Sequence, residues 1–328
     1  MRWLIRIVLV LAVLWGGYWY IGQRAFEAGA ANWFAQMQAS GKQAENAGLE
    51  VHGFPNRFDL TITAPKIFDP DQGMGWQADF LQILTLSYTP WHVIAAFPPE
   101  QRITLPHETI TLNTAKMQAS VVVSPEPDLP LDRITLVADA LTAAGDIGWR
   151  VAAGSLRFAT KIDPTRENSH EVGLEVSDIT PDASLTALVN GALPAQIKMV
   201  RLDAYAGFSA PIDRFVLTTN PQLDSLEIKD LRVLWGDVTV SASGSLQVDA
   251  AGFATGGVTL QLENWRLALD IAQAMGMIAP EARNIWDSAA SLLALQSGGK
   301  DAIQLPLSFV DGETRIGPVQ VGPAPRMR

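Results

Sequence analysis

The segment Phe58-Asp59-Leu60-Thr61-Ile62-Thr63 carries the pattern that decides the fold. Its apolar and polar side chains alternate strictly, which is typical of a β-strand with one buried and one exposed face. Short alternating segments of this kind recur as far as Val321, and turn sequences such as Asp71-Gln72-Gly73 and Asp311-Gly312 separate them. Because few helices intervene, the sequence predicts a mainly β fold (a β-rich α+β protein) with large curved antiparallel sheets or an open groove.

Two segments interrupt the strands. Residues 90–98, Pro-Trp-His-Val-Ile-Ala-Ala-Phe-Pro, are apolar and bounded by prolines, which predicts a short helix or a packed loop. Residues 265–296 show helical spacing, and Pro280 suits the first turn of a second helix. We therefore expect a helical pair at about 265–296. The apolar packing face predicted for its second helix consists of Ile285, Ala289, Leu292 and Leu293.

Upstream of the strands, Trp3–Gly22 is an apolar run about as long as a transmembrane helix of roughly 20 residues. Basic residues favour the cytoplasmic side of a membrane, and aromatic residues favour the membrane–water interface. The run has basic residues on its N-terminal side and aromatic residues at its C-terminal end, namely Arg2, Arg6, Trp15, Tyr18, Trp19 and Tyr20. We therefore predict that residues 1–23 are a transmembrane anchor with a cytoplasmic N-terminus.

A cleavable signal peptide is the alternative, because Ala28-Gly29-Ala30 has the small-x-small form of a cleavage site. The apolar run, however, is longer than the usual signal-peptide core of ~7–15 residues. We expect residues 24–48 to form a stalk or packing helix that continues the anchor, and residues 49–328 to form the β-rich domain. Both alternatives place that domain outside the cytoplasm.

Composition excludes several kinds of partner. The chain has 328 residues and a formal net charge of −10, with 48% hydrophobic and 18% charged residues. An acidic chain disfavours nucleic-acid binding, which needs basic patches. The sequence contains no cysteine, so neither a disulfide framework nor a thiolate metal site can form.

The sequence shows no set of residues that would carry catalysis or hold a cofactor. The carboxylate pairs Asp69/Asp71 and Glu126/Asp128 flank prolines, and we interpret them as solvated turns. The histidines lack a second metal ligand at helical spacing, and we interpret them as surface residues. They are His52, His92, His107 and His170. We therefore expect no catalytic residue, no cofactor, no metal and no enzymatic activity.

Tryptophan is abundant, with ten residues in the chain. Six lie in the predicted β-rich domain: Trp76, Trp91, Trp149, Trp235, Trp265 and Trp286. Buried aromatic residues dominate the packing of ordinary cores, but they also line apolar grooves that hold acyl chains. The sequence is compatible with both a closed core and an open groove.

Several motifs resemble an alphaproteobacterial family, domain of unknown function family 2125. They include Gly53-Phe54-Pro55, followed by Phe58, Leu60 and Ile62, and the segments Tyr88–Ile94 and Ile316–Pro318. These motifs are structural, and the family carries no assigned catalytic residues. More distantly, Gly244–Leu262 and the layout are similar to AsmA-like envelope proteins, which join an inner-membrane anchor to a periplasmic β-rich groove associated with lipid transport.

The resemblance implies a protein anchored in the bacterial inner membrane, with the bulk of the chain in the periplasm. We expect the lipid bilayer as a partner through the N-terminal helix, and a lipid or another apolar molecule as ligand. The expected function is non-enzymatic binding or handling of lipid-like ligands in the cell envelope. The alternative is a scaffold or interaction protein of an envelope complex, with a closed core and a protein partner.

Overall fold

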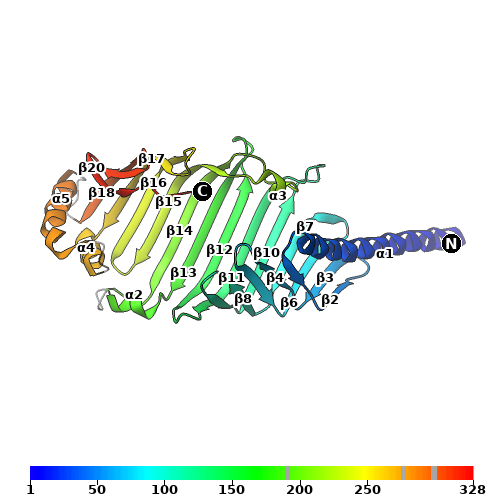
Figure 1. The fold of residues 1–328 in the computed structure, drawn as a ribbon. Helices are drawn as coiled ribbons and strands as arrows, with labels where there is room; N and C mark the ends of the chain where they lie inside the picture. Colours follow the sequence, from blue (N-terminus) through cyan, green and yellow to red (C-terminus); the bar gives the residue numbers. More distant parts are fainter. Residues whose placement is uncertain (189–192, 275, 277, 297–300, 328) are drawn as a thin grey trace. The chain divides into compact units, whose positions relative to one another are not determined.

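The computed structural model describes residues 1–188, 193–274, 276, 278–296 and 301–327. The chain consists of two compact units. Unit 1 contains Met1–Pro125 and Leu136–Gly148, and unit 2 contains Glu126–Thr135 and Trp149–Arg328. Strand β11 (Leu131–Gly145) is divided between them. Figure 1 shows the fold coloured along the sequence.

Unit 1 begins with a long helix, α1 (Arg2–Ala39), and continues with short strands. These strands are β1 (Gln43–Glu45), β2 (Gly48–His52), β3 (Arg57–Thr63), β4 (Lys66–Asp69), β5 (Met74–Ala78), β6 (Phe80–Leu86), β7 (Thr89–Phe97), β8 (Glu100–Thr104), β9 (Thr109–Asn113) and β10 (Lys116–Val123). The expectation of a helix over residues 24–48 is wrong at its end, because α1 ends at Ala39, and the chain turns at Gly41, where φ is +86°, before it forms β1.

The strands of unit 1 form two antiparallel ladders. One has the order β2–β3–β6–β7–β10. The other has the order β1–β4–β5–β8–β9, and residues Thr142–Gly145 of β11 pair with β9. Trp76 on β5 packs edge-on against Phe97 on β7, with ring centroids 6.4 Å apart, so side chains of the two ladders meet.

Strand β7 corrects the prediction of a helix or loop at residues 90–98. It is an interior strand between β6 and β10, and its Val, Ile, Trp and Phe residues have high β-propensity. Pro90 is tolerated because the register of β6 with β7 is irregular between Leu86/Thr89 and Thr85/Val93. A proline at a strand end therefore does not exclude the strand that follows it.

Unit 2 is an antiparallel meander in which each strand pairs with the next. Its strands are β12 (Arg150–Ile162), β13 (Ser169–Ile179), β14 (Ile197–Phe208), β15 (Leu223–Trp235), β16 (Val238–Val248), β17 (Ala254–Glu263), β18 (Ala302–Val310), β19 (Glu313–Ile316) and β20 (Val319–Pro323). Two short helices, α2 (Ala183–Leu188) and α3 (Val216–Thr219), lie in its connections. The predicted Asp311-Gly312 hairpin turn is confirmed, with φ of +55° and +75°.

The predicted helical pair is also confirmed, as α4 (Trp265–Ala274), the 3-10 turn η1 (Pro280–Ala282) and α5 (Arg283–Gln296). Of the packing face predicted for α5, only Leu293 is confirmed. Ala290 and Ala294 are buried against Trp265 and Ile303, with Trp286 and Leu293 beside them. The predicted face members Ile285 and Leu292 are instead 71% and 64% exposed, and Ala289 is exposed too.

The fold class is therefore confirmed: the protein is mainly β, built from open antiparallel sheet, with a long apolar N-terminal helix and helices near the C-terminus.

Candidate functional site

Aromatic side chains attach α1 to unit 1 midway along the helix. Trp15 Nε1 donates a hydrogen bond to the carbonyl oxygen of Pro55, in the β2–β3 turn, at 2.8 Å. The Tyr18 hydroxyl donates to the carbonyl oxygen of Ser87, in the β6–β7 turn, at 2.6 Å. Two hairpin tips of unit 1 are thus fixed to neighbouring turns of the helix.

Trp19 extends this attachment by one turn of α1. Its Nε1 donates to the carbonyl oxygen of Arg57 at 2.8 Å, and its ring lies edge-on to Phe54 at 5.3 Å. The ring of Phe58 stacks on Trp19 at 6.1 Å and on Phe26 at 5.1 Å. Such aromatic pairs stabilise by about 0.5–1.5 kcal/mol beyond the area that they bury.

The motif that suggested the family packs beneath these rings. Phe58, Leu60 and Ile62 are 2%, 3% and 6% exposed and belong to one buried cluster with Phe34 of α1. Gly53 has φ of +105°, which favours glycine in the turn that precedes β3. We call the whole arrangement the helix–hairpin junction, and its members are Trp15, Tyr18, Trp19, Gly53, Phe54, Pro55, Phe58, Leu60, Ile62 and Ser87.

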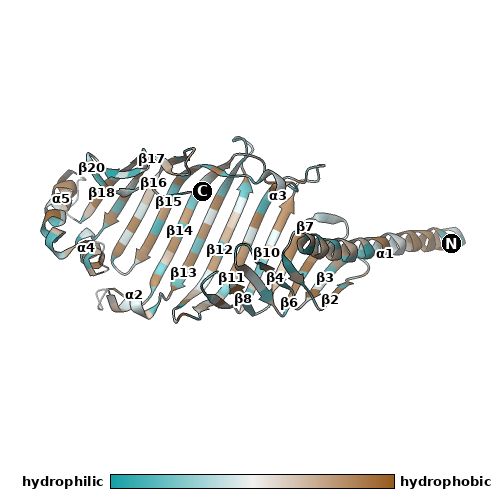
Figure 2. Ribbon diagram, viewed as in Figure 1, coloured by the Kyte–Doolittle hydropathy of each residue, from teal (hydrophilic) through white to brown (hydrophobic). Residues whose placement is uncertain are grey.

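The other predicted anchor residues lie outside the junction. Arg2, Arg6 and Tyr20 are exposed on α1, and the Arg24 guanidinium carbon lies 5.6 Å from the centre of the Tyr20 ring. The large apolar residues Leu4, Leu9 and Leu14 are 68%, 59% and 64% exposed. α1 is long and apolar enough to cross a membrane, and none of its most apolar 18-residue window is buried. Figure 2 shows this apolar half of the helix in brown.

Unit 2 offers a second candidate site, an apolar sheet face. Register pairs Phe158 with Leu174, Leu174 with Leu202 and Leu202 with Leu231. The row two residues further along contains only aliphatic side chains: Leu156, Val176, Val200 and Val233. Side chains two residues apart on a strand lie on one face, so these rows form a continuous apolar face.

This apolar face of unit 2 is covered at one end. The apolar face continues onto β17 and β18, where its residues pack against α4 and α5. These residues are Leu262, Ile303 and Leu305. On β12–β14 the side chains of its two rows are half-buried and, among the described residues, belong to none of the buried clusters. The face therefore remains accessible over these strands.

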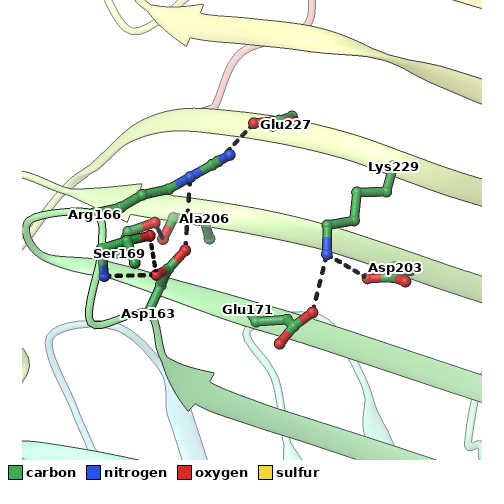
Figure 3. A network of polar contacts seen from close by, with 9 residues as sticks. Asp163, Arg166, Ser169, Glu171, Asp203, Ala206, Glu227 and Lys229 are labelled. Atoms are coloured by element: carbon green, nitrogen blue, oxygen red, sulfur yellow. Dashed lines mark hydrogen bonds and ion pairs between the residues drawn. The ribbon is translucent and has the colours of Figure 1, made fainter.

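The opposite face of the same strands is polar. Arg157, Glu175, Arg201 and Arg232 form one cross-strand row there. Figure 3 shows a second group of charges on this face. Arg166 donates to Glu227 at 2.6 Å, and Lys229 lies 3.0 Å from Glu171. Brown and teal residues consequently alternate along these strands in Figure 2.

The Tyr205 ring contacts both cations of this charged group. Its ring centre lies 4.0 Å from the Arg166 guanidinium carbon and 3.9 Å from Lys229 Nζ. Hydrogen bonding with Tyr205 and then Glu171 raises the pKa of Lys229. Exposed ion pairs of this kind contribute little to stability, so we interpret the group as a solvated face.

Histidine placement corrects one expectation. His52 and His107 are exposed, as predicted, but His170 on β13 is only 4% exposed and packs edge-on against Phe208 at 6.1 Å. Burial lowers the pKa of His170, partly offset by Asp132. His92 is half-buried and lies 2.9 Å from the Ser120 hydroxyl. In the described residues, no three His, Asp or Glu side chains come together as metal ligands.

The carboxylates behave as turn residues. Asp69 Oδ1 accepts hydrogen bonds from the backbone N–H groups of Asp71 and Gln72, and Lys42 Nζ lies 3.1 Å from Asp69 Oδ2. The Lys42 ammonium and these bonds lower the pKa of Asp69, which favours the ionised form. Asp71, Glu126 and Asp128 are exposed.

Sequence reasoning missed the helix–hairpin junction and the continuity of the apolar face. The junction joins residues up to 69 positions apart, and no local pattern marks such a contact. The apolar face had a usable signal, because long alternating strands that pair in register must place their apolar residues on one side.

The fold and these sites define a mainly β protein with a candidate membrane-spanning helix and an apolar sheet face. The chain belongs to the family described as "Uncharacterized protein conserved in bacteria (DUF2125)", which matches residues 19–325. The match begins at Trp19 of the helix–hairpin junction and includes both units. Comparison with curated proteins and with solved structures finds no match.

Proposed function

We propose that this protein is a non-enzymatic bacterial envelope protein, held in the inner membrane by α1, that binds the acyl chains of lipids on the apolar face of unit 2. The observation that carries this proposal is the separation of the two faces of β12–β14. On one face, the two rows described above contain only apolar side chains and are half-buried, whereas the other face bears a charged row. Accessible apolar faces of this kind mark binding sites for apolar partners.

The width of the two apolar rows fits an acyl chain. From β12 to β15 there are three inter-strand spacings, which together measure about 14 Å. One leaflet of a bilayer is about 15 Å deep, half of the ~30 Å hydrocarbon core. An acyl chain lying across these strands would therefore have apolar contact over about the length that it occupies in the membrane.

The helix–hairpin junction supports an anchor that is retained rather than cleaved. Cleavage at Ala28-Gly29-Ala30 would remove Trp19 and Phe26, whose rings stack on the buried Phe58. The loss of both rings would expose apolar surface on unit 1, which is unfavourable by about 25 cal/mol per Å². In the proposed topology Arg2 and Arg6 lie in the cytoplasm, and the strands of units 1 and 2 lie in the periplasm.

The experiment compares lipid bound to matched cross-strand variants. The double variant Leu174→Gln/Leu202→Gln places two amides on the apolar face, at positions that pair directly. The control, Glu175→Gln/Arg201→Gln, places the same amides at the adjacent pair on the polar face. Both proteins are purified in full length in the same detergent, so lipid around α1 contributes equally.

We expect phospholipid extracted per mole of protein to fall several-fold in the apolar-face variant and to stay unchanged in the control. Circular dichroism and a thermal midpoint verify that both variants fold. Equal lipid content in folded wild type and folded apolar-face variant would refute acyl-chain binding at this face.

A second candidate function, a scaffold for an envelope complex, is favoured by α5. Its residues Ile285, Leu292 and Leu295 are 71%, 64% and 76% exposed and are spaced by seven and three positions, as on one helix face. Such a face suits a helical protein partner. A photo-reactive residue at Leu292 that captures one stoichiometric protein, in a strain whose apolar-face variant is fully functional, would favour the scaffold over lipid binding.

A further inference from the structure

Two hairpin tips of unit 1 expose aromatic side chains beside the apolar helix. Phe54, in the β2–β3 turn, is 61% exposed, and Tyr88, in the β6–β7 turn, is 57% exposed. Each is adjacent in sequence to a carbonyl bound by α1, because Trp15 bonds to Pro55 and Tyr18 bonds to Ser87. The two tips are also joined to each other, since the Ser87 N–H donates to the Asn56 carbonyl oxygen at 3.0 Å.

The length of α1 determines the depth of these tips relative to a membrane. A span of roughly 20 residues that begins at Trp3 ends near Gly22. Trp15 lies seven residues before Gly22, or about 10 Å along the helix axis, and Tyr18 lies four residues before it, or about 6 Å. If the membrane span ended before Trp15, it would contain only the twelve residues Trp3–Leu14, or about 18 Å of helix, which is too short to cross a hydrocarbon core of ~30 Å.

We propose that the β2–β3 and β6–β7 tips enter the interface of the same bilayer that α1 spans, with Phe54 and Tyr88 in contact with lipid. Amphipathic groups at membrane surfaces typically reach about 5–10 Å into the headgroup and acyl boundary, which matches the depth obtained above. This inference rests on the membrane anchoring proposed for α1, but not on lipid binding by unit 2.

The chemistry of the tips favours lipid over a protein partner. The turn Gly53-Phe54-Pro55-Asn56 and the pair Ser87-Tyr88 contain no charged residue. Exposed backbone polar groups are costly in a membrane. Here the carbonyl oxygens of Gly53, Pro55, Asn56 and Ser87 all accept hydrogen bonds from other protein groups. Charge returns at Arg57, which pairs with Asp59 at 2.9 Å.

The absence of cysteine from the chain allows single-site labelling to test this docking. Nitroxide labels are placed on the full-length protein at Phe54→Cys and Tyr88→Cys. Leu9→Cys reports on the anchor. Met74→Cys is the matched control, because it is an exposed apolar residue of unit 1 (45% exposed) at a different tip.

The control position lies near the C-terminal end of α1, away from the two tips. Met74 pairs with Asp69, and Asp69 is bonded to Lys42, three residues beyond the helix. Trp15 and Ala39 are 24 residues apart, which is about 36 Å of helix. The control therefore reports on unit 1 well away from the proposed membrane contact.

The labelled proteins are reconstituted in vesicles of phosphatidylethanolamine and phosphatidylglycerol. Collision rates with oxygen, which enters lipid, are compared with those of a water-soluble nickel chelate. We expect the oxygen-to-nickel ratio at positions 54 and 88 to exceed that at 74 several-fold and to approach the ratio at 9. Ratios at 54 and 88 equal to that at 74, with position 9 still in lipid, would overturn the docking and leave the anchor intact. A water-accessible position 9 would overturn both.

Discussion

Replacing Gly22 with alanine tests how closely α1 packs on unit 1. A Cβ atom at this position would overlap the ring of Phe58, with Cε1 at 2.9 Å, Cε2 at 3.2 Å and Cζ closer still. Phe58 is 2% exposed and stacks on Phe26, so its ring has little room to move away. Overpacking of a well-packed core typically costs about 1–3 kcal/mol.

The matched control is Gly29→Ala, about two turns further along the same helix. A Cβ there would meet no heavy atom within 4 Å. Both substitutions raise helix propensity by roughly 0.5–1 kcal/mol, so this contribution cancels in their difference. We therefore expect Gly22→Ala to be less stable than Gly29→Ala by about 1–3 kcal/mol.

Urea unfolding of the full-length protein in detergent, followed by tryptophan emission, measures this difference. Replacing the Phe58 ring by the smaller side chain in Phe58→Leu should relieve the clash. The losses of unfolding free energy caused by Gly22→Ala and Phe58→Leu should therefore be less than additive in the double variant, with a coupling energy of about 0.5–3 kcal/mol. Equal stabilities of the two alanine variants, or additivity in the double variant, would refute the packing of Gly22 on Phe58.

Three further predictions concern hydrogen bonds and pH. Trp19→Phe, which removes the bond to the Arg57 carbonyl oxygen, should lower the free energy of unfolding by about 1 kcal/mol relative to Trp33→Phe; no difference between the two in urea unfolding would contradict the bond's contribution. Hydrogen bonds from the Ser184 hydroxyl and then from the Arg150 N–H lower the pKa of Asp182 to about 2. Wild type should therefore have a higher thermal midpoint than Asp182→Asn above pH ~3.9, and this difference should disappear as the pH falls through about 2. Because burial lowers the pKa of His170, the folded state should lose stability as the pH falls below about 6.5, and His170→Leu should show a smaller loss; equal slopes of thermal midpoint against pH would argue against a neutral buried imidazole.

The parts of the fold that depend on local patterns follow from the sequence. The alternation at Phe58–Thr63 predicts β3, and Asp311-Gly312 predicts the turn between β18 and β19. Pro280 marks η1, at the start of the second helix. In these cases the residues that determine the structure are neighbours in sequence, so period and turn chemistry suffice.

The errors arise where distant partners decide the structure. Residues 90–98 look like a bounded apolar loop, but β6 and β10 on either side make them an interior strand. On α5 the small residues Ala290 and Ala294 allow close approach to Trp265 and Ile303, so the helix turns its larger residue Leu292 outward. His170 looks like a surface histidine until Phe208, on the neighbouring strand, is placed beside it.

The candidate sites were predictable only in part. The aromatic residues Trp15, Tyr18 and Trp19 suggest a membrane interface by their position alone, whereas the structure also gives each a hydrogen bond to unit 1. Such bonds depend on the tertiary arrangement of turns that lie 38 to 69 residues away, and no sequence period encodes that distance.

Acyl-chain binding on the apolar face of unit 2 is the central claim, and photo-cross-linking in cells tests it most directly. A benzophenone amino acid is placed at Leu202, on the apolar face, or at the neighbouring Arg201, on the polar face. After irradiation, mass spectrometry of the purified protein identifies what each position has captured. We predict phospholipid adducts at position 202 and none at position 201. Equal lipid capture at both positions, or capture of protein alone at position 202, would contradict the claim.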